Sequence, residues 1–121
     1  MSGRTPDLTL IWERCGGEWC LLAACKPPPQ AAGVYIIWQP LLFVRGRRAV
    51  CVGHGAIGDR LAQHRGDERM AAQGGSSLLV TWAACPAGAR DGVVRFLAAA
   101  YRPHASKSDP RAAPVSVNLP L

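Results

Sequence analysis

Two short apolar runs lie close together in the chain and set the pattern of its central part. Residues 33–38 (GVYIIW) and 49–53 (AVCVG) are rich in the β-branched and aromatic residues that favour strands. The segment between them contains Pro40 and an arginine-rich stretch, and it is too long for a two-residue turn. The pattern predicts a hairpin whose strands are joined by a wide loop, with Gly46 at its tip.

After this hairpin the apolar positions take on helical spacing. Ile57 and Leu61, followed by His64 or Arg65, recur at the spacing of one helix face. We expect a glycine-rich loop before this helix and the stretch at residues 74–77 (GGSS) to end it.

The remaining apolar stretches predict one more strand and one more helix. Residues 78–85 are a strand candidate, and residues 93–102 carry an apolar stripe at helical spacing that Pro103 ends. The tail beyond is mostly loop, in which residues 115–119 can lie extended along the sheet. The predicted order of elements in this part of the chain is thus β-β-α-β-α.

The first part of the chain has a different character. Residues 8–25 predict two short strands around a Gly16-Gly17 turn, and three consecutive prolines stiffen the connector that follows. The sequence therefore divides into an N-terminal β extension with a proline-rich connector, residues 1–32, and a single domain, residues 33–121.

Length and composition narrow the class of protein. The chain has 121 residues, of which 49% are hydrophobic, yet no apolar run approaches the ~20 residues of a membrane span. Its first residues lack the basic start and long apolar core of a signal peptide. We therefore expect no membrane partner and an intracellular, cytoplasmic location.

The charge balance points to a polyanionic partner. Fourteen basic and eight acidic residues give a net charge of +6. Nucleic acid is the commonest partner of such a protein, although a basic surface that only confers solubility remains the alternative.

The cysteines favour buried thiols over a metal site. Five cysteines are an odd number, which predicts reduced thiols in a chain without a signal peptide. Zinc is disfavoured because no C-x-x-C pair exists. Cys20 and Cys25 flank Leu-Leu-Ala-Ala, so we expect small buried hydrophobic side chains at these positions.

Several segments together resemble one enzyme family. In order and spacing, GVYIIW, VCVGHG and IGDRLAQHR, followed by LLVTWA, DGVVRFLAAAYRP and VNLP, resemble the GIY-YIG nucleases over residues 33–121. The resemblance implies an α+β domain with a small central antiparallel sheet flanked by helices. It also implies cleavage of DNA with one divalent ion, Mg²⁺ or Mn²⁺.

The resemblance assigns roles to positions on the hairpin. Gly33 and Tyr35 match the first motif, whose tyrosine lies close to the attacking water. Cys51 stands where the second motif has a tyrosine, and Gly53 matches the glycine of that motif. His54 follows at a position that is often polar and near the nucleophile.

Further matches lie on the helix and in the tail. Arg60 matches the arginine that holds the scissile phosphate, and Asn118 matches a polar residue near the family site. His64 lies four residues after Arg60, so both side chains project from one helix face independently of any resemblance. An arginine fork fits phosphate oxygens, and a histidine can take a proton from water. The alternative is a solvated helix face.

One departure bears on catalysis. Val94 stands where the family has its metal-binding glutamate, and valine offers no oxygen to a hard cation. Asp91, one turn earlier, is a possible substitute acting through a water. The alternative is that Val94 is a core residue, since Val93 and Leu97 on the same helix are apolar.

The sequence thus predicts a GIY-YIG-like endonuclease domain whose activity is weakened or lost. The alternatives are a non-catalytic module that binds nucleic acid or regulates, and a domain that binds other proteins. Nucleic-acid contacts are expected from the arginines near the hairpin loop and on the helix, namely Arg45, Arg47, Arg48 and Arg65.

Overall fold

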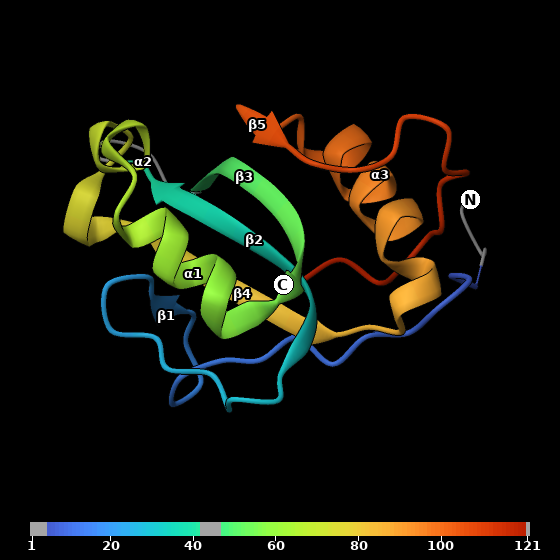
Figure 1. Cartoon of the computed structure of the whole chain (residues 1–121), viewed down its shortest axis with the longest axis horizontal. Coiled ribbons are helices and arrows are strands. Elements are labelled where there is room, and N and C mark those ends of the chain that lie inside the picture. Colours follow the sequence, from blue (N-terminus) through green and yellow to red (C-terminus); the bar gives the residue numbers. More distant parts are fainter. Residues whose placement is uncertain (1–4, 42–46, 121) are drawn as a thin grey trace.

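A computed structural model describes residues 5–41 and 47–120 of the chain. It confirms the α+β class, with helices packed on a five-stranded sheet in the order β1-β4-β2-β3-β5 (Figure 1). The strands are β1 (Cys20–Leu21), β2 (Ala32–Pro40), β3 (Arg47–Ala56), β4 (Leu79–Ala84) and β5 (Ala105–Ser106). The helices are α1 (Ile57–Arg65), α2 (Glu68–Ala72) and α3 (Arg90–Tyr101), with the short 3-10 turns η1 (Gly75–Ser77) and η2 (Ala87–Ala89).

The sheet is mixed, whereas the sequence predicted an antiparallel one. β2 pairs antiparallel with both β3 and β4, as expected for the hairpin and the third strand. The exception is β5, which lies parallel to β3 at its edge. The predicted loop after Gly53 is also absent, because β3 continues to Ala56 and α1 begins at the next residue.

The two faces of the hairpin bury different side chains because neighbouring residues of a strand point to opposite sides. Val34, Ile36 and Trp38 belong to a core cluster with residues of α3. Tyr35 and Ile37 belong to a second cluster with residues of α1. The helices α1 and α3 therefore cover opposite faces of β2 and β3 (Figure 1).

The helix predicted after the hairpin is interrupted. α1 ends at Arg65 with Gly66 as its C-cap, and a separate short helix, α2, follows. The Asp67 carboxylate starts α2 by accepting a hydrogen bond from the backbone N–H of Arg69 at 2.8 Å. The chain therefore turns at Gly66 and Asp67, between the two helices.

The N-terminal segment is part of the sheet. The predicted turn forms at Gly16 and Gly17, which both have positive φ. Across the turn Cys15 and Glu18 form an antiparallel bridge, so the pairing around the turn is limited to these two residues. The flanking residues also join β4: Glu13 bridges to Trp82, and β1 pairs with Leu79 and Val80. The extension thus adds an edge strand to the domain.

The prediction that the thiols are all reduced is wrong for one pair. Cys15 and Cys20 form a disulfide across the glycine turn, because the turn brings their Cα atoms to 5.0 Å. Cys20 and Cys25 are buried as predicted, and Cys25, Cys51 and Cys85 are free thiols.

The C-terminal segment pairs with the N-terminal one. Leu8 bridges to Val117, so this part of the tail is extended but lies outside the five-stranded sheet. Asn118 receives a hydrogen bond from the Leu10 N–H at 2.6 Å and donates to the Leu10 carbonyl at 2.9 Å. Its amide is thus occupied in joining the C-terminal segment to the N-terminal one.

Among the described residues, no helix is long and apolar enough to cross a membrane.

Candidate functional site

A hydrogen-bonded tyrosine–histidine pair lies between β2 and α1. The Tyr35 hydroxyl is 2.7 Å from His64 Nε2, and the two rings meet edge to face. Cys51 Sγ lies 3.9 Å from the same nitrogen. The tyrosine comes from the face of β2 that α1 covers, and the histidine from the last turn of α1. The packing of α1 on this face of the sheet therefore brings these two predicted residues together.

Burial keeps these groups neutral. Tyr35 is 3% exposed, and burial raises the pKa of its hydroxyl well above the ordinary value. Burial lowers the pKa of His64 and raises the pKa of the Cys51 thiol to about 11. At neutral pH the site therefore contains a phenol, a neutral imidazole and a thiol, and the imidazole is able to accept a proton.

The motif glycines make space for this arrangement. A Cβ atom at Gly53 would lie 2.6 Å from Tyr35 Cζ, so only glycine leaves room for the ring. At Gly33 a Cβ would overlap the carbonyl oxygen of Ala83 on β4. Packing therefore requires glycine at both positions: Gly53 makes room for the Tyr35 ring, and Gly33 allows β2 to approach β4 closely.

Arg60 lies beside the pair on the exposed side of α1. Its Nε donates to the His54 carbonyl at 3.2 Å and its Nη1 to Gln63 Oε1 at 3.3 Å, which orients the guanidinium. Arg60, Tyr35 and His64 line a small pocket of about 80 Å³, which we call the Tyr35 pocket. Its remaining wall is formed by Cys51, Val52, Gly53, His54, Gln63 and Lys107.

The imidazole of His54 has another partner. His54 lies opposite Val34 in the hairpin, so its side chain belongs to the face of the sheet that α3 covers. Its Nε2 is 3.0 Å from Asp91 Oδ1. The same carboxylate oxygen accepts a hydrogen bond from the Asp109 N–H at 3.0 Å, and this bond is the main cause that lowers the pKa of Asp91.

The residues near the pocket do not fit a resident Mg²⁺ or Mn²⁺ ion. Val94 is 0% exposed and lies in the apolar cluster under α3, on the face of the sheet opposite Tyr35. Asp91 Oδ1, the substitute proposed from the sequence, is occupied by His54 and the Asp109 amide. Within residues 5–41 and 47–120, no three His, Cys, Asp or Glu side chains gather at one point.

The arginines that were predicted to contact nucleic acid do not form one cluster among the described residues. Arg45 lies outside the described residues. Arg47 stacks on the Trp19 ring at 3.8 Å, and Arg48 is exposed at the start of β3. Arg65 donates to the backbone carbonyls of Leu22 and Cys25, so its guanidinium joins α1 to the N-terminal segment. Arg65 therefore has a structural role that the sequence did not predict, and its contact with nucleic acid stays a prediction.

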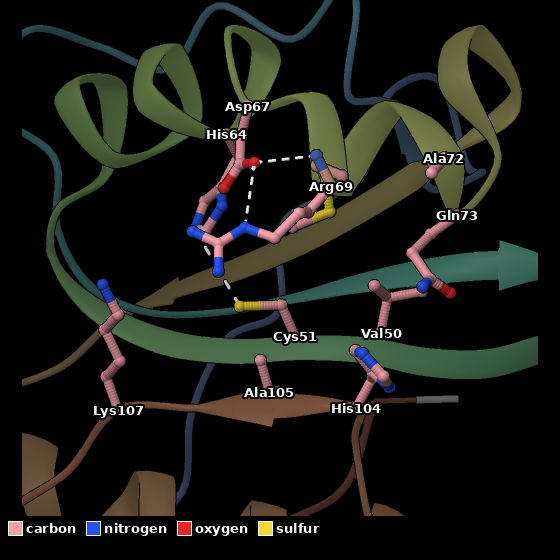
Figure 2. Close-up of a pocket in the computed structure, with 11 residues that line it drawn as sticks. Val50, Cys51, His64, Asp67, Arg69, Ala72, Gln73, His104, Ala105 and Lys107 are labelled. Carbon is pink, nitrogen blue, oxygen red and sulfur yellow. Dashed lines mark hydrogen bonds and ion pairs between the residues drawn. The ribbon is translucent and has the colours of Figure 1, made fainter.

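Sequence reasoning missed one cation of the site. Lys107 directly follows β5 and lines the Tyr35 pocket, across from His64 and near Cys51 (Figure 2). It arrives there because β5 pairs with β3 at Cys51 and Val52. No local pattern in the tail signals this pairing, since β5 is only two residues long.

No family model matches the chain, and no curated protein or solved structure matches it significantly. The likeness to GIY-YIG nucleases thus remains a resemblance of motif residues.

Proposed function

We propose that this protein is a GIY-YIG-like domain that binds nucleic acid by holding one backbone phosphate in the Tyr35 pocket. DNA is the partner that the resemblance implies, and metal-dependent hydrolysis is weakened or lost. The observation that carries the proposal is the convergence of Arg60 and Lys107 on a pocket that also contains the Tyr35–His64 pair.

The charges of the pocket suit a phosphodiester. Arg60 uses only part of its donors on His54 and Gln63, and the remaining N–H groups are available to phosphate oxygens. Lys107 supplies a second positive charge on the pocket wall. The net charge of +6 adds a long-range attraction for the same partner.

The neutral pair gives the pocket a proton-dependent donor. If His64 takes up a proton, its Nε2–H donates to Tyr35, and the phenol hydrogen is then free to bond to a phosphate oxygen. Phosphate binding is therefore coupled to protonation of His64. Because burial lowers the pKa of this histidine, binding is expected to become tighter only as the pH falls below about 6.5, the ordinary pKa of a histidine.

Residual endonuclease activity is a second candidate, favoured by the 2.7 Å contact of Tyr35 and His64. A neutral imidazole at a phosphate site can take a proton from an attacking water, and Arg60 can stabilise the charge that develops on the phosphate. The side chains that line the pocket include no carboxylate for a hard cation, so this candidate activity rests on Tyr35, His64 and Arg60.

The binding proposal is tested by anisotropy of a labelled duplex between about 50 and 200 mM salt, the range over which phosphate contacts lose affinity. Arg60→Ala and Lys107→Ala should each reduce the log-log salt slope, and because both cations serve one phosphate, neither reduction should exceed about 0.9. Arg111→Ala is the matched control, because Arg111 is exposed and lies outside the pocket. Loss of affinity in all three variants alike, or binding that ignores salt, would contradict the proposal.

Hydrolysis is tested by plasmid nicking in EDTA, Mg²⁺ and Mn²⁺, with Tyr35→Phe and Arg60→Ala beside the unchanged protein. We expect slow nicking or none. Nicking that both variants retain in full would identify a contaminating nuclease and remove the second candidate.

A further inference from the structure

A larger cavity adjoins the Tyr35 pocket. It has a volume of about 410 Å³ and lies between α2 on one side and β3 and β5 on the other (Figure 2). Cys51, His64 and Lys107 line both spaces, so a ligand can reach from one into the other. We call this second space the α2 cavity.

The lining of the α2 cavity is apolar at its centre and polar at its ends. Val50, Met70 and Ala105 present aliphatic surface and a thioether. Gln73 and His104 lie at the end away from Lys107 (Figure 2). Such a mixture of apolar surface with a few polar groups is typical of sites for small organic ligands, which measure about 300–1,000 Å³.

The charges around the cavity favour a ligand whose anionic group lies at the Lys107 end, on the side of the Tyr35 pocket. Its acidic side chain, Asp67, accepts a hydrogen bond from the backbone N–H of Arg69 and lies 3.7 Å from Arg69 Nε. This carboxylate is therefore already balanced by a neighbouring cation. Lys107 lies on the wall shared with the Tyr35 pocket, and no acidic side chain in the described part of the chain forms an ion pair with it.

We propose that the α2 cavity is a subsite for one unpaired nucleobase whose neighbouring phosphate lies in the Tyr35 pocket. This inference rests on the proposed function and names its substrate class: single strands, frayed ends or extruded nucleotides. One flat face of the base would pack on Val50 and Ala105, which lie on the paired strands β3 and β5, and the Met70 sulfur can contact an aromatic edge. The Gln73 amide offers both a donor and an acceptor to the polar edge of a base.

The shape of the cavity explains why the base must be unpaired. A base inside a duplex is stacked on its neighbours and has its edge hydrogen-bonded to the opposite strand. It cannot enter a space between a helix and a strand unless it leaves the stack. A phosphate in the Tyr35 pocket, by contrast, is accessible in both duplex and single-stranded nucleic acid.

The test compares a labelled oligothymidylate with a tetrahydrofuran abasic oligomer of equal length. Both strands carry the same phosphates, so only the base subsite distinguishes them. We expect the oligothymidylate to bind about tenfold tighter, a difference of about 1.4 kcal/mol. Ala105→Phe, which fills the cavity from the exposed strand β5, should abolish the difference without removing the binding of the abasic strand.

Ala100→Phe on the exposed side of α3 is the matched control and should preserve the difference. Ala72→Phe fills the cavity from α2 and replaces Ala105→Phe if that variant does not fold. Equal affinity of the unchanged protein for the two strands would overturn the base subsite and leave the phosphate pocket standing. Binding of neither strand would overturn the proposed function itself, and the base subsite with it.

Discussion

Replacing Val94 by glutamate separates the two interpretations that the sequence allows for this position. If Val94 marks a lost metal ligand, Val94→Glu restores a hard oxygen donor and should raise cleavage of DNA. In the structure, however, Val94 is 0% exposed and shares an apolar cluster with Val34, Val52 and Leu97. We therefore expect Val94→Glu to destabilise the fold and to leave nuclease activity unchanged.

The size of the effect follows from the burial. A glutamate with an ordinary pKa of about 4.3 must stay protonated in this cluster, which costs about 1.36 kcal/mol for each pH unit above that value, or roughly 3.7 kcal/mol at pH 7. An unpaired buried carboxyl group costs a further 1–3 kcal/mol or so. Such a loss is comparable with the whole stability of many domains, about 5–15 kcal/mol.

The pH dependence has a definite sign. Burial would raise the pKa of the introduced carboxyl group in the folded state above its unfolded value. Its protonated form is therefore tolerated best at low pH, and stability is lost as the pH rises. Lowering the pH from about 7 to about 5 should restore about 2.7 kcal/mol relative to the unchanged protein.

The assay is urea unfolding of Val94→Glu at both pH values, followed by tryptophan fluorescence, with plasmid nicking in Mg²⁺ measured in parallel. Ala99→Glu is the control, because Ala99 lies on the exposed side of the same helix. It should change the free energy of unfolding by less than about 1 kcal/mol. A Val94→Glu protein that is as stable as this control at neutral pH and cuts plasmid would refute the reasoning.

Three further outcomes are expected. Gly53→Ala should destabilise by about 1–3 kcal/mol and displace Tyr35, since the new methyl group overlaps the phenol ring; a crystal structure with an unmoved ring would contradict this. Because burial lowers the pKa of His64, the stability that its neutral form provides should be lost as the pH falls below about 6.5, by at most about 1.36 kcal/mol per unit. Urea titrations from about pH 8 to about pH 5 should show a smaller fall in His64→Gln. Cys15→Ala removes the disulfide with Cys20, which closes a short loop with a sequence separation of 5. The free energy of unfolding should fall by about 2 kcal/mol, and thermal melts under oxidising conditions measure this loss.

The predicted roles of three residues illustrate where sequence reasoning was sufficient and where it was not. Arg60 and His64 were correctly expected on one face of a helix, since their spacing alone specifies that geometry. The hydrogen bonds of Arg65 could not be predicted from helix spacing. Its guanidinium bonds to carbonyls of the N-terminal segment, which is distant in the chain.

By itself the sequence determined the hairpin, the helices α1 and α3, and the shared helix face of Arg60 and His64, because strand and helix periodicities are local properties. Only the tertiary structure decided that Val94 is a core residue and that Lys107 reaches the Tyr35 pocket. Both depend on long-range packing: Val94 on the seating of α3 against the sheet, and Lys107 on the pairing of β5 with β3. Such contacts are set by how distant segments bury apolar surface and satisfy backbone hydrogen bonds together, and no short window of sequence contains that information.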